Sequence, residues 1–286
     1  MSERSFEKII PGHAASDGAG VKLRRSLGAS QALRHDPFLM LDEFYSDDPD
    51  DYIGGFPPHP HRGFETVTYM LAGRMRHEDH LGNQGDLEPG GVQWMSAAGG
   101  IIHSEMPQQS EGRMRGFQLW INLPAAEKLK PASYRDIAAS EIPEVRLANG
   151  GLARVIAGSF VGDGETFHGP VQGISTEPLF LDLHLPAGSA QQVPIPPGHN
   201  ALVYAYDGSV SSGAEAPGPG AGQAGLLSMA GDGVTLQAGD SENAGLLVLA
   251  ARPLGEPVVQ YGPFVMNTRE EIEQALDDYR TGRLTA

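Results

Sequence analysis

Short runs of β-branched, aromatic and aliphatic residues alternate along this chain with glycine- and proline-rich turns. Five runs are prominent: Thr66–Leu71, Gly116–Leu123, Leu179–Leu185, Ala201–Tyr206 and Gly245–Ala250. The 38 glycines and 22 prolines are scattered over the whole length and separate one run from the next. Regularly spaced short strands between turn signals are typical of β-sandwiches and β-barrels. The pattern therefore predicts an all-β protein.

A helical pattern stands at the C-terminal end of the chain. Its apolar side chains recur at the spacing of one helix face: Ile272, Ala275, Leu276 and Tyr279. Thr268 with Glu271 three residues later forms a capping-box pattern, and Gly282 is a suitable stop. We therefore expect a short helix from Thr268 to Arg280.

The two halves of the chain show strands and turns in a similar order. The residues between them, 124–143, are interpreted as a connection. We therefore expect two β-barrel domains, over residues 1–135 and 145–286, with the helix at the end of the second. The alanine- and glycine-rich segment 211–225 is expected to be a low-complexity loop that packs against nothing.

The charge and cysteine content exclude several functions. The 36 acidic and 20 basic residues give a net charge of -16, which repels phosphate backbones and anionic membranes, so we expect no direct nucleic-acid or membrane partner. Without cysteine there can be no disulfide, thiolate metal site or cysteine nucleophile. The first residues lack the apolar core that a signal peptide would have, and no run approaches about 20 apolar residues. A cytoplasmic location is therefore expected.

Two short segments concentrate possible metal ligands. FPPHPHRGFE contains His59 and His61, and AGGIIHSE contains His103 and Glu105. Residues two apart on a strand share a face, so each pair can aim at one point. If the two strands lie side by side or face each other, all four side chains can meet at one metal ion.

These four ligand types suit a catalytic metal. Three neutral imidazoles and a carboxylate fit a borderline divalent ion and leave two open positions on an octahedral one. A catalytic metal needs open positions, whereas a structural metal does not. We expect Fe(II), since nitrogen and oxygen ligation with vacancies is the usual setting of oxygen chemistry. Manganese, nickel, copper or zinc could occupy the same ligands.

The same parity can be continued along the first segment. If Gly63 introduces no bulge, Glu65, Val67 and Tyr69 fall on the face of the histidines. A face with histidines followed by apolar side chains is typical of a site inside a barrel.

The other histidines carry weaker signals. His77 and His80 could form a second metal cluster, but a polar turn explains them better. His184 and His199 have no His-x-His around them, so we expect ordinary satisfied histidines and a second domain without metal. The chain has no nucleophile elbow, phosphate-binding loop or dinucleotide fingerprint.

The histidine segments also carry a family resemblance. His59, His61, Glu65 and Gly73 match the cupin motif His-x-His-x3-Glu-x7-Gly. Longer blocks resemble the pirin family: PFLMLDEF, FPPHPHRGFETVTYML, GGVQWMSAAGGIIHSEMP, LWINLP and GPFVMNTREEIEQALDDYRTGR. They run from about residue 37 to residue 283, so the resemblance covers nearly the whole chain.

The resemblance implies a bicupin, an all-β protein of two antiparallel jelly-roll barrels with iron bound in the N-terminal one. It implies His59, His61, His103 and Glu105 as ligands, the set that the parity of the strands also selects. In pirins the glutamate of the second strand replaces that of the first motif, so Glu65 has no assigned role. Segment 211–225 departs from the family and resembles an insertion.

Pirin-like proteins have been assigned two kinds of role. Some are quercetin 2,3-dioxygenases, which open a flavonol ring with dioxygen and release carbon monoxide. This role implies a flavonol-like aromatic substrate, with Glu105 as ligand and general base. Val67, Tyr69 and Met95 could then line a pocket for a flat ring, or be plain core.

Other pirin-like proteins are iron-bearing regulators that bind a protein partner, with the oxidation state of the metal as the switch. This role would use the same ligands, so the motif does not separate it from the enzyme. A third alternative, a metal-free structural bicupin, would leave four ligand-type residues without a task.

Overall fold

The computed structural model describes residues 2–162, 164–213 and 216–286. The chain forms two compact units, each built from two separate stretches. The 14–139 unit consists of Ala14–Ala139 and Leu254–Ala286, and the 140–253 unit of Met1–His13 and Ser140–Pro253. This differs at both ends from the continuous domains expected over 1–135 and 145–286, because each terminal segment pairs or packs with a distant part of the chain.

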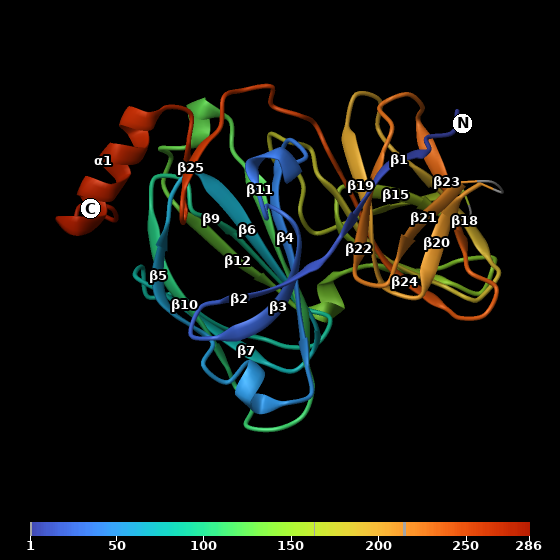
Figure 1. The fold of residues 1–286 in the computed structure, drawn as a ribbon, viewed down its shortest axis with the longest axis horizontal. Helices are drawn as coiled ribbons and strands as arrows, with labels where there is room; N and C mark the ends of the chain where they lie inside the picture. The colour runs from blue at the N-terminus through green and yellow to red at the C-terminus, as the bar shows by residue number, and fades with distance from the viewer. Residues whose placement is uncertain (1, 163, 214–215) are drawn as a thin grey trace. The chain divides into compact units, whose positions relative to one another are not determined.

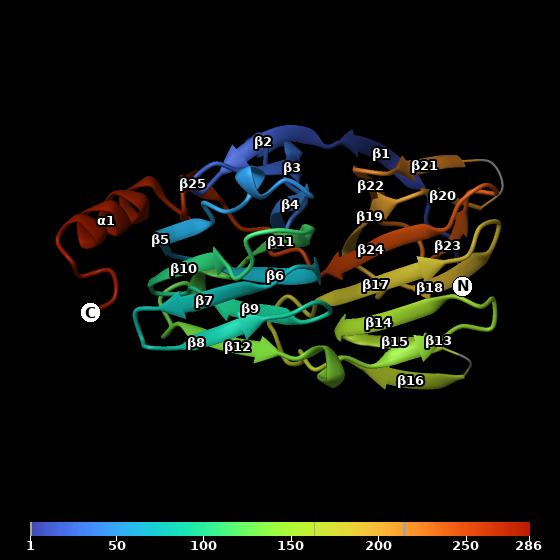
Figure 2. The ribbon, with the colours of Figure 1, turned by 90° about the horizontal axis from the view of Figure 1, so that it is seen from below.

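The 14–139 unit contains a seven-stranded and a four-stranded sheet in its described part. In spatial order the larger sheet consists of β12 (Ser133–Ile137), β9 (Val92–Ser96), β6 (Phe64–Ala72), β11 (Met114–Asn122), β4 (Phe38–Ser46), β3 (Val21–Leu27) and β2 (His13–Asp17). The smaller sheet consists of β5 (Phe56–His61), β10 (Ile101–Pro107), β7 (Met75–Asp79) and β8 (Gln84–Leu87), which lie side by side in Figure 2. The segment expected to be a connection thus supplies an edge strand, β12.

The C-terminal segment completes this unit. It contains the strand pair β25 (Val259–Tyr261) and β26 (Phe264–Met266), followed by helix α1 (Arg269–Arg280), beside β25 in Figure 1. Thr268 caps the helix and forms the predicted capping box with Glu271. Ile272 and Ala275 are buried against Phe264 and Met266. The prediction of a C-terminal helix is confirmed.

The 140–253 unit repeats the plan of two sheets over its described residues. The seven-stranded sheet consists of β1 (Phe6–Pro11), β22 (Gln223–Leu227), β19 (Asn200–Asp207), β24 (Ala244–Ala251), β17 (Leu179–Leu185), β14 (Leu152–Ala157) and β13 (Glu144–Arg146). The four-stranded sheet consists of β18 (Ala190–Pro194), β23 (Gly233–Ala238), β20 (Ser209–Ser212) and β21 (Ala216–Gly220). Its core is apolar, with Leu181, Val203 and Val248 fully buried.

Short elements connect these sheets. They are the strand pair β15 (Ser159–Gly162) and β16 (Glu165–His168), and the 3-10 turns η1 (Gln31–Leu33), η2 (Pro49–Asp51), η3 (Ala125–Glu127) and η4 (Ala139–Glu141). The ladders between the named strands are antiparallel, and the five predicted runs lie in β6, β11, β17, β19 and β24, apart from Leu123, which follows the end of β11. The prediction of an all-β fold with two antiparallel barrels is confirmed. In the described ranges, no helix combines the length and apolarity needed to cross a bilayer.

The prediction of an unpacked loop over 211–225 is wrong for most of that segment. It contributes to β20, β21 and β22, while residues 214–215 lie outside the described part of the chain. The glycines have a packing role: a Cβ at Gly218 or Gly225 would lie 2.4 or 2.6 Å from the Phe6 ring. Phe6 lies on β1, which pairs with β22. Small residues here make room for an aromatic side chain from the other end of the chain.

Candidate metal centre

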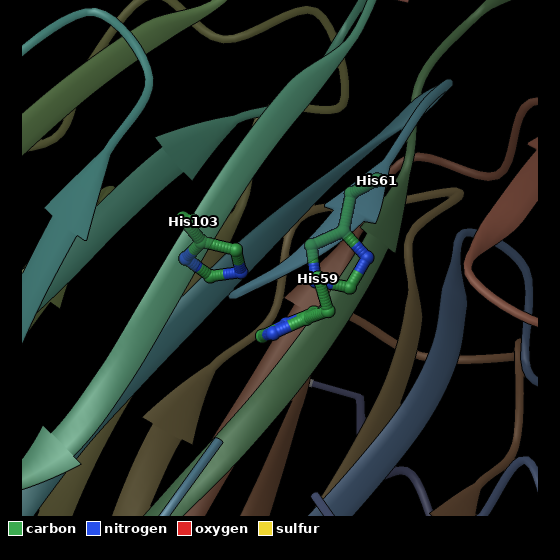
Figure 3. A group of neighbouring side chains, drawn as sticks. All are labelled: His59, His61 and His103. Atoms are coloured by element: carbon green, nitrogen blue, oxygen red, sulfur yellow. The ribbon is translucent and has the colours of Figure 1, made fainter. Parts of the chain in front are cut away.

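Two adjacent strands bring three histidines together. β5 and β10 pair antiparallel, with His103 directly opposite His59 and Ile101 opposite His61. Directly opposed residues share a face of the sheet, so the three imidazoles lie on one side. Figure 3 shows them facing one another, with ring centroids 4.4–4.9 Å apart. One nitrogen from each ring lies within 4.8 Å of the others, close enough to hold a metal ion.

The protonation of these rings suits a divalent metal. Burial is the main cause that lowers the pKa of His61 and of His103 well below the ordinary value, so both rings are neutral. The buried Nε2 of each has no hydrogen-bond partner. The Nδ1 of His59 lies 2.8 Å from the Pro57 carbonyl oxygen, which leaves its Nε2 available. Unpartnered buried nitrogens are costly, and a bound metal would satisfy them, so the donor set fits the expected group.

Glu105 lies near the histidines but is held by other partners. The register of β10 against β5 shifts between His103 and Glu105, so Glu105 faces Phe56. Its side chain is buried, and its Oε1 accepts a hydrogen bond of 2.8 Å from Thr68. Glu105 is outside the close histidine group and lines the same cavity as His59 and His61.

The cavity beside the histidines has a volume of about 590 Å³. Its lining residues come from strands of both sheets of the 14–139 unit. Its apolar lining includes Phe56, Trp120 and Met40. Arg25 and Asp42 add a polar wall, where the guanidinium donates hydrogen bonds of 2.8 and 2.7 Å to the two carboxylate oxygens. The space can receive a flat aromatic molecule with polar substituents.

The parity continued through Gly63 is wrong. Gly63 has a φ of +92° and interrupts the extended conformation between β5 and β6, which belong to different sheets. On β6, Thr68 reaches Glu105, so the alternating Glu65, Val67 and Tyr69 point to the opposite face. Burial raises the pKa of the Glu65 carboxyl to about 7.

The three residues proposed as pocket or core are core. Val67, Tyr69 and Met95 are fully buried, and none of them lines the cavity. Met95 packs with Ala97 and Ile101. The cavity instead receives Gln118 and Trp120 from β11, opposite Asp42 and Met40 of β4. The sequence could have indicated these residues, because Gln118 and Trp120, like Met40 and Asp42, are two apart and therefore share one face of their strand.

The polar-turn interpretation holds for His80 but not for His77. His80 is exposed in the turn after β7, where its Nδ1 accepts a hydrogen bond from the Ile102 amide. His77 is buried on β7, with its Nδ1 3.2 Å from the Nδ1 of His103. The alternation of buried Met75 and His77 on a short strand was the signal that could have placed it.

The histidines of the 140–253 unit have different surroundings. His184 Nε2 lies 3.2 Å from both the Asp182 carboxylate and the Tyr206 hydroxyl, and the bond to Asp182 raises its pKa. His199 Nε2 lies 3.8 Å from Glu177. Within the described ranges, the grouping of three ligand-type side chains consists of His59, His61 and His103. The absence of metal from the second domain stays a prediction.

Family models, relatives and a solved structure match this chain along most of its length. The family model "Pirin" matches residues 20–121, and "Pirin C-terminal cupin domain" matches residues 180–285. A Pseudomonas aeruginosa protein, whose name assigns it quercetin 2,3-dioxygenase activity provisionally, is 58% identical over 98% of both chains. Human pirin is 40% identical over 94% of this chain and 89% of its own. The crystal structure of quercetin 2,3-dioxygenase from Acinetobacter baumannii is 31% identical, with a TM-score of 0.89 over 100% of this chain and 99% of that one.

Proposed function

The chain belongs to the pirin family, and from that premise we propose that it is a metal-dependent dioxygenase that opens flavonols such as quercetin with dioxygen. The observation that carries the proposal is a close group of three imidazoles, two of which, His59 and His61, line a cavity of about 590 Å³ together with the buried Glu105. The names of the relatives from Pseudomonas aeruginosa and Acinetobacter baumannii support the same reaction.

We assign the metal to His59, His61, His103 and Glu105. Fe(II) is the first choice, and Mn, Ni, Cu or Zn would suit the same donors. When bound, the metal supplies the Lewis-acid and redox chemistry that flavonol oxygenation requires. The remaining steps belong to side chains of the cavity.

The cavity would orient the substrate by shape and polarity. Phe56 and Trp120 offer apolar surface to a flat ring system, while the paired Arg25 and Asp42 offer hydrogen-bonding groups to its hydroxyls.

Glu105 is the group proposed to accept the flavonol hydroxyl proton. Thr68 donates to its Oε1, which leaves the other carboxylate oxygen for the substrate. Because Glu105 also lines the cavity, its carboxylate can accept the proton of a hydroxyl bound there.

The test is oxygen uptake with quercetin by protein reconstituted with Fe, Mn, Ni, Cu or Zn, with carbon monoxide measured in the same vessel. We expect equal consumption of oxygen and flavonol with at least one metal, and a loss of at least about 100-fold in Glu105→Gln. Glu78→Gln, on the same sheet but exposed, is the matched control.

If no flavonol or catechol is turned over with any of these metals, the enzyme proposal is wrong. The alternative, a redox-sensing iron protein that regulates a protein partner, then predicts binding that differs between ferrous and ferric protein. A pull-down in both oxidation states tests that alternative.

A further inference from the structure

A buried histidine outside the ligand set contacts one of the ligands. β7 pairs with β10 on the side opposite β5, with Asp79 across from His103 and His77 across from Glu105. Both imidazoles are 1% exposed, and their Nδ1 atoms lie 3.2 Å apart. This is a hydrogen-bond distance between two nitrogens, and it requires a single proton between them.

The position of that proton follows from the geometry of His103. Its Nε2 is the nitrogen without a partner, so the Nε2 lone pair is free for a metal. A neutral imidazole carries its one proton on the other nitrogen, and His103 therefore donates from Nδ1. The Nδ1 of His77 must then accept, which places the proton of His77 on its own Nε2.

The surroundings of His77 agree with this tautomer. Its Nε2 lies 3.8 Å from the Asp79 carboxylate, a distance at which the negative charge favours an N–H but which is too long for a hydrogen bond, so this buried nitrogen has no hydrogen-bond partner. That carboxylate is itself fixed by the amides of Leu81 and Asn83 and by the Asn83 side chain. The Tyr134 ring stacks on His77 with centroids 4.5 Å apart and an angle of 18°. His77 is thus held in one orientation by packing and by charge.

We propose that His77 is a positioning residue of the metal centre, which accepts the Nδ1 proton of His103 and so fixes the tautomer and ring angle with which His103 presents Nε2 to the metal. The proposal rests on the metal centre assigned above. A metal-bound imidazole usually donates its second N–H to a carboxylate or carbonyl. Here a second imidazole occupies that place, between His103 and Asp79.

The sharpest test separates hydrogen bonding from packing. His77→Phe keeps a ring that can stack on Tyr134 but removes the acceptor, whereas His77→Gln keeps an acceptor oxygen but loses the ring. We expect His77→Phe to bind Co(II) or Ni(II) about 10–100-fold more weakly than the wild type, and His77→Gln to recover most of that loss. His80→Phe, in the exposed turn, should bind like the wild type.

The second measurement needs no variant. In the Zn(II)-loaded wild type, ¹⁵N spectra of the histidine rings should show His103 protonated at Nδ1, His77 protonated at Nε2, and a coupling between the two Nδ1 atoms through the hydrogen bond.

Three results would overturn the proposal: equal metal affinity in His77→Phe, a weaker affinity in His77→Gln than in His77→Phe, or a His77 protonated at Nδ1. If the wild type itself binds no metal, the metal centre fails and His77 has no ligand to position. If metal binds but quercetin is not turned over, the enzyme proposal fails while the role of His77 stands.

Discussion

At the residue scale, the carboxylate of Glu105 depends on a threonine outside the histidine motif. Thr68 Oγ1 lies 2.8 Å from Glu105 Oε1 and 2.6 Å from Gln118 Oε1. One hydroxyl has one proton, so it cannot donate to two oxygens. Amide oxygen and nitrogen are exchangeable in assignment, and the consistent arrangement has Gln118 donating from Nε2 to Thr68, which donates to Glu105.

Replacing this hydroxyl should impair catalysis more than metal binding. Thr68→Val keeps the shape of the side chain and removes the donor to a charged carboxylate, an interaction of about 1.5–3 kcal/mol. We expect kcat for quercetin to fall by roughly 10–100-fold with metal content unchanged. Thr66→Val, the same change two residues earlier on the same strand face, is the control. An equal loss of kcat in both variants would show that the Thr68 hydroxyl has no specific role in catalysis.

Glu65 supports a prediction about pH and stability. Burial raises its pKa from 4.5 to about 7, so the folded state favours the protonated carboxyl. The resulting stabilisation is complete below pH 4.5 and is lost as the pH rises through 7, and the total loss is about 3 kcal/mol. Glu65→Gln should therefore lose less stability than the wild type between pH 4.5 and pH 8, measured by urea unfolding. The exposed Glu88→Gln should follow the wild type; a parallel pH dependence in Glu65→Gln would contradict the account.

At the scale of elements, the C-terminal segment is attached to the turn that follows the proposed ligand His61. The Lys128 ammonium donates to the carbonyl oxygens of Gly63 and Val265 and to Asn122 Oδ1. A Cβ at Gly63 would lie 1.9 Å from the Val265 carbonyl oxygen, so only glycine allows this approach. β26 and the turn after β5 therefore share one buried cation.

Lys128→Met should loosen both the segment and the site. The change leaves three buried oxygens without a donor, and we expect the free energy of unfolding to fall by about 2–4 kcal/mol. Hydrogen exchange should increase in β26 and around Gly63. Lys130→Met, which removes an exposed ion pair with Glu127, is the matched control. Unchanged exchange at both places in Lys128→Met would show that the ammonium does not hold them.

The sequence predicted the elements that have a clear periodicity of their own. It missed those that depend on contacts with residues far away in the chain. The helix and the strands at Thr66–Leu71 and Leu179–Leu185 have strong periodicity of their own. β21 has none, because its Gly218 is explained by the Phe6 ring of β1, which is more than 200 residues away in the sequence, and by the Val210 carbonyl of β20. His77 was assigned to a turn because charged neighbours conceal the alternation of a short strand. The break at Gly63 depends on the Val265 backbone, about 200 residues later.

At the scale of the whole molecule, two units of similar plan carry different chemistry. Each contains a seven-stranded and a four-stranded sheet in its described part. The 14–139 unit surrounds a cavity with histidines at its wall, whereas the cluster of buried side chains in the 140–253 unit is apolar. The sequence could not show that residues 1–13 belong to the 140–253 unit, since β1 pairs with β22, whose residues are more than 200 positions away. We therefore predict one metal ion per chain.

Anaerobic titration of the metal-free protein with Fe(II) tests this claim most directly. We predict one binding site per chain in the wild type, loss of that site in His61→Ala, and an unchanged site in the control His184→Ala. A second equivalent of tightly bound iron, or full binding in His61→Ala, would contradict a single metal centre at His59, His61, His103 and Glu105.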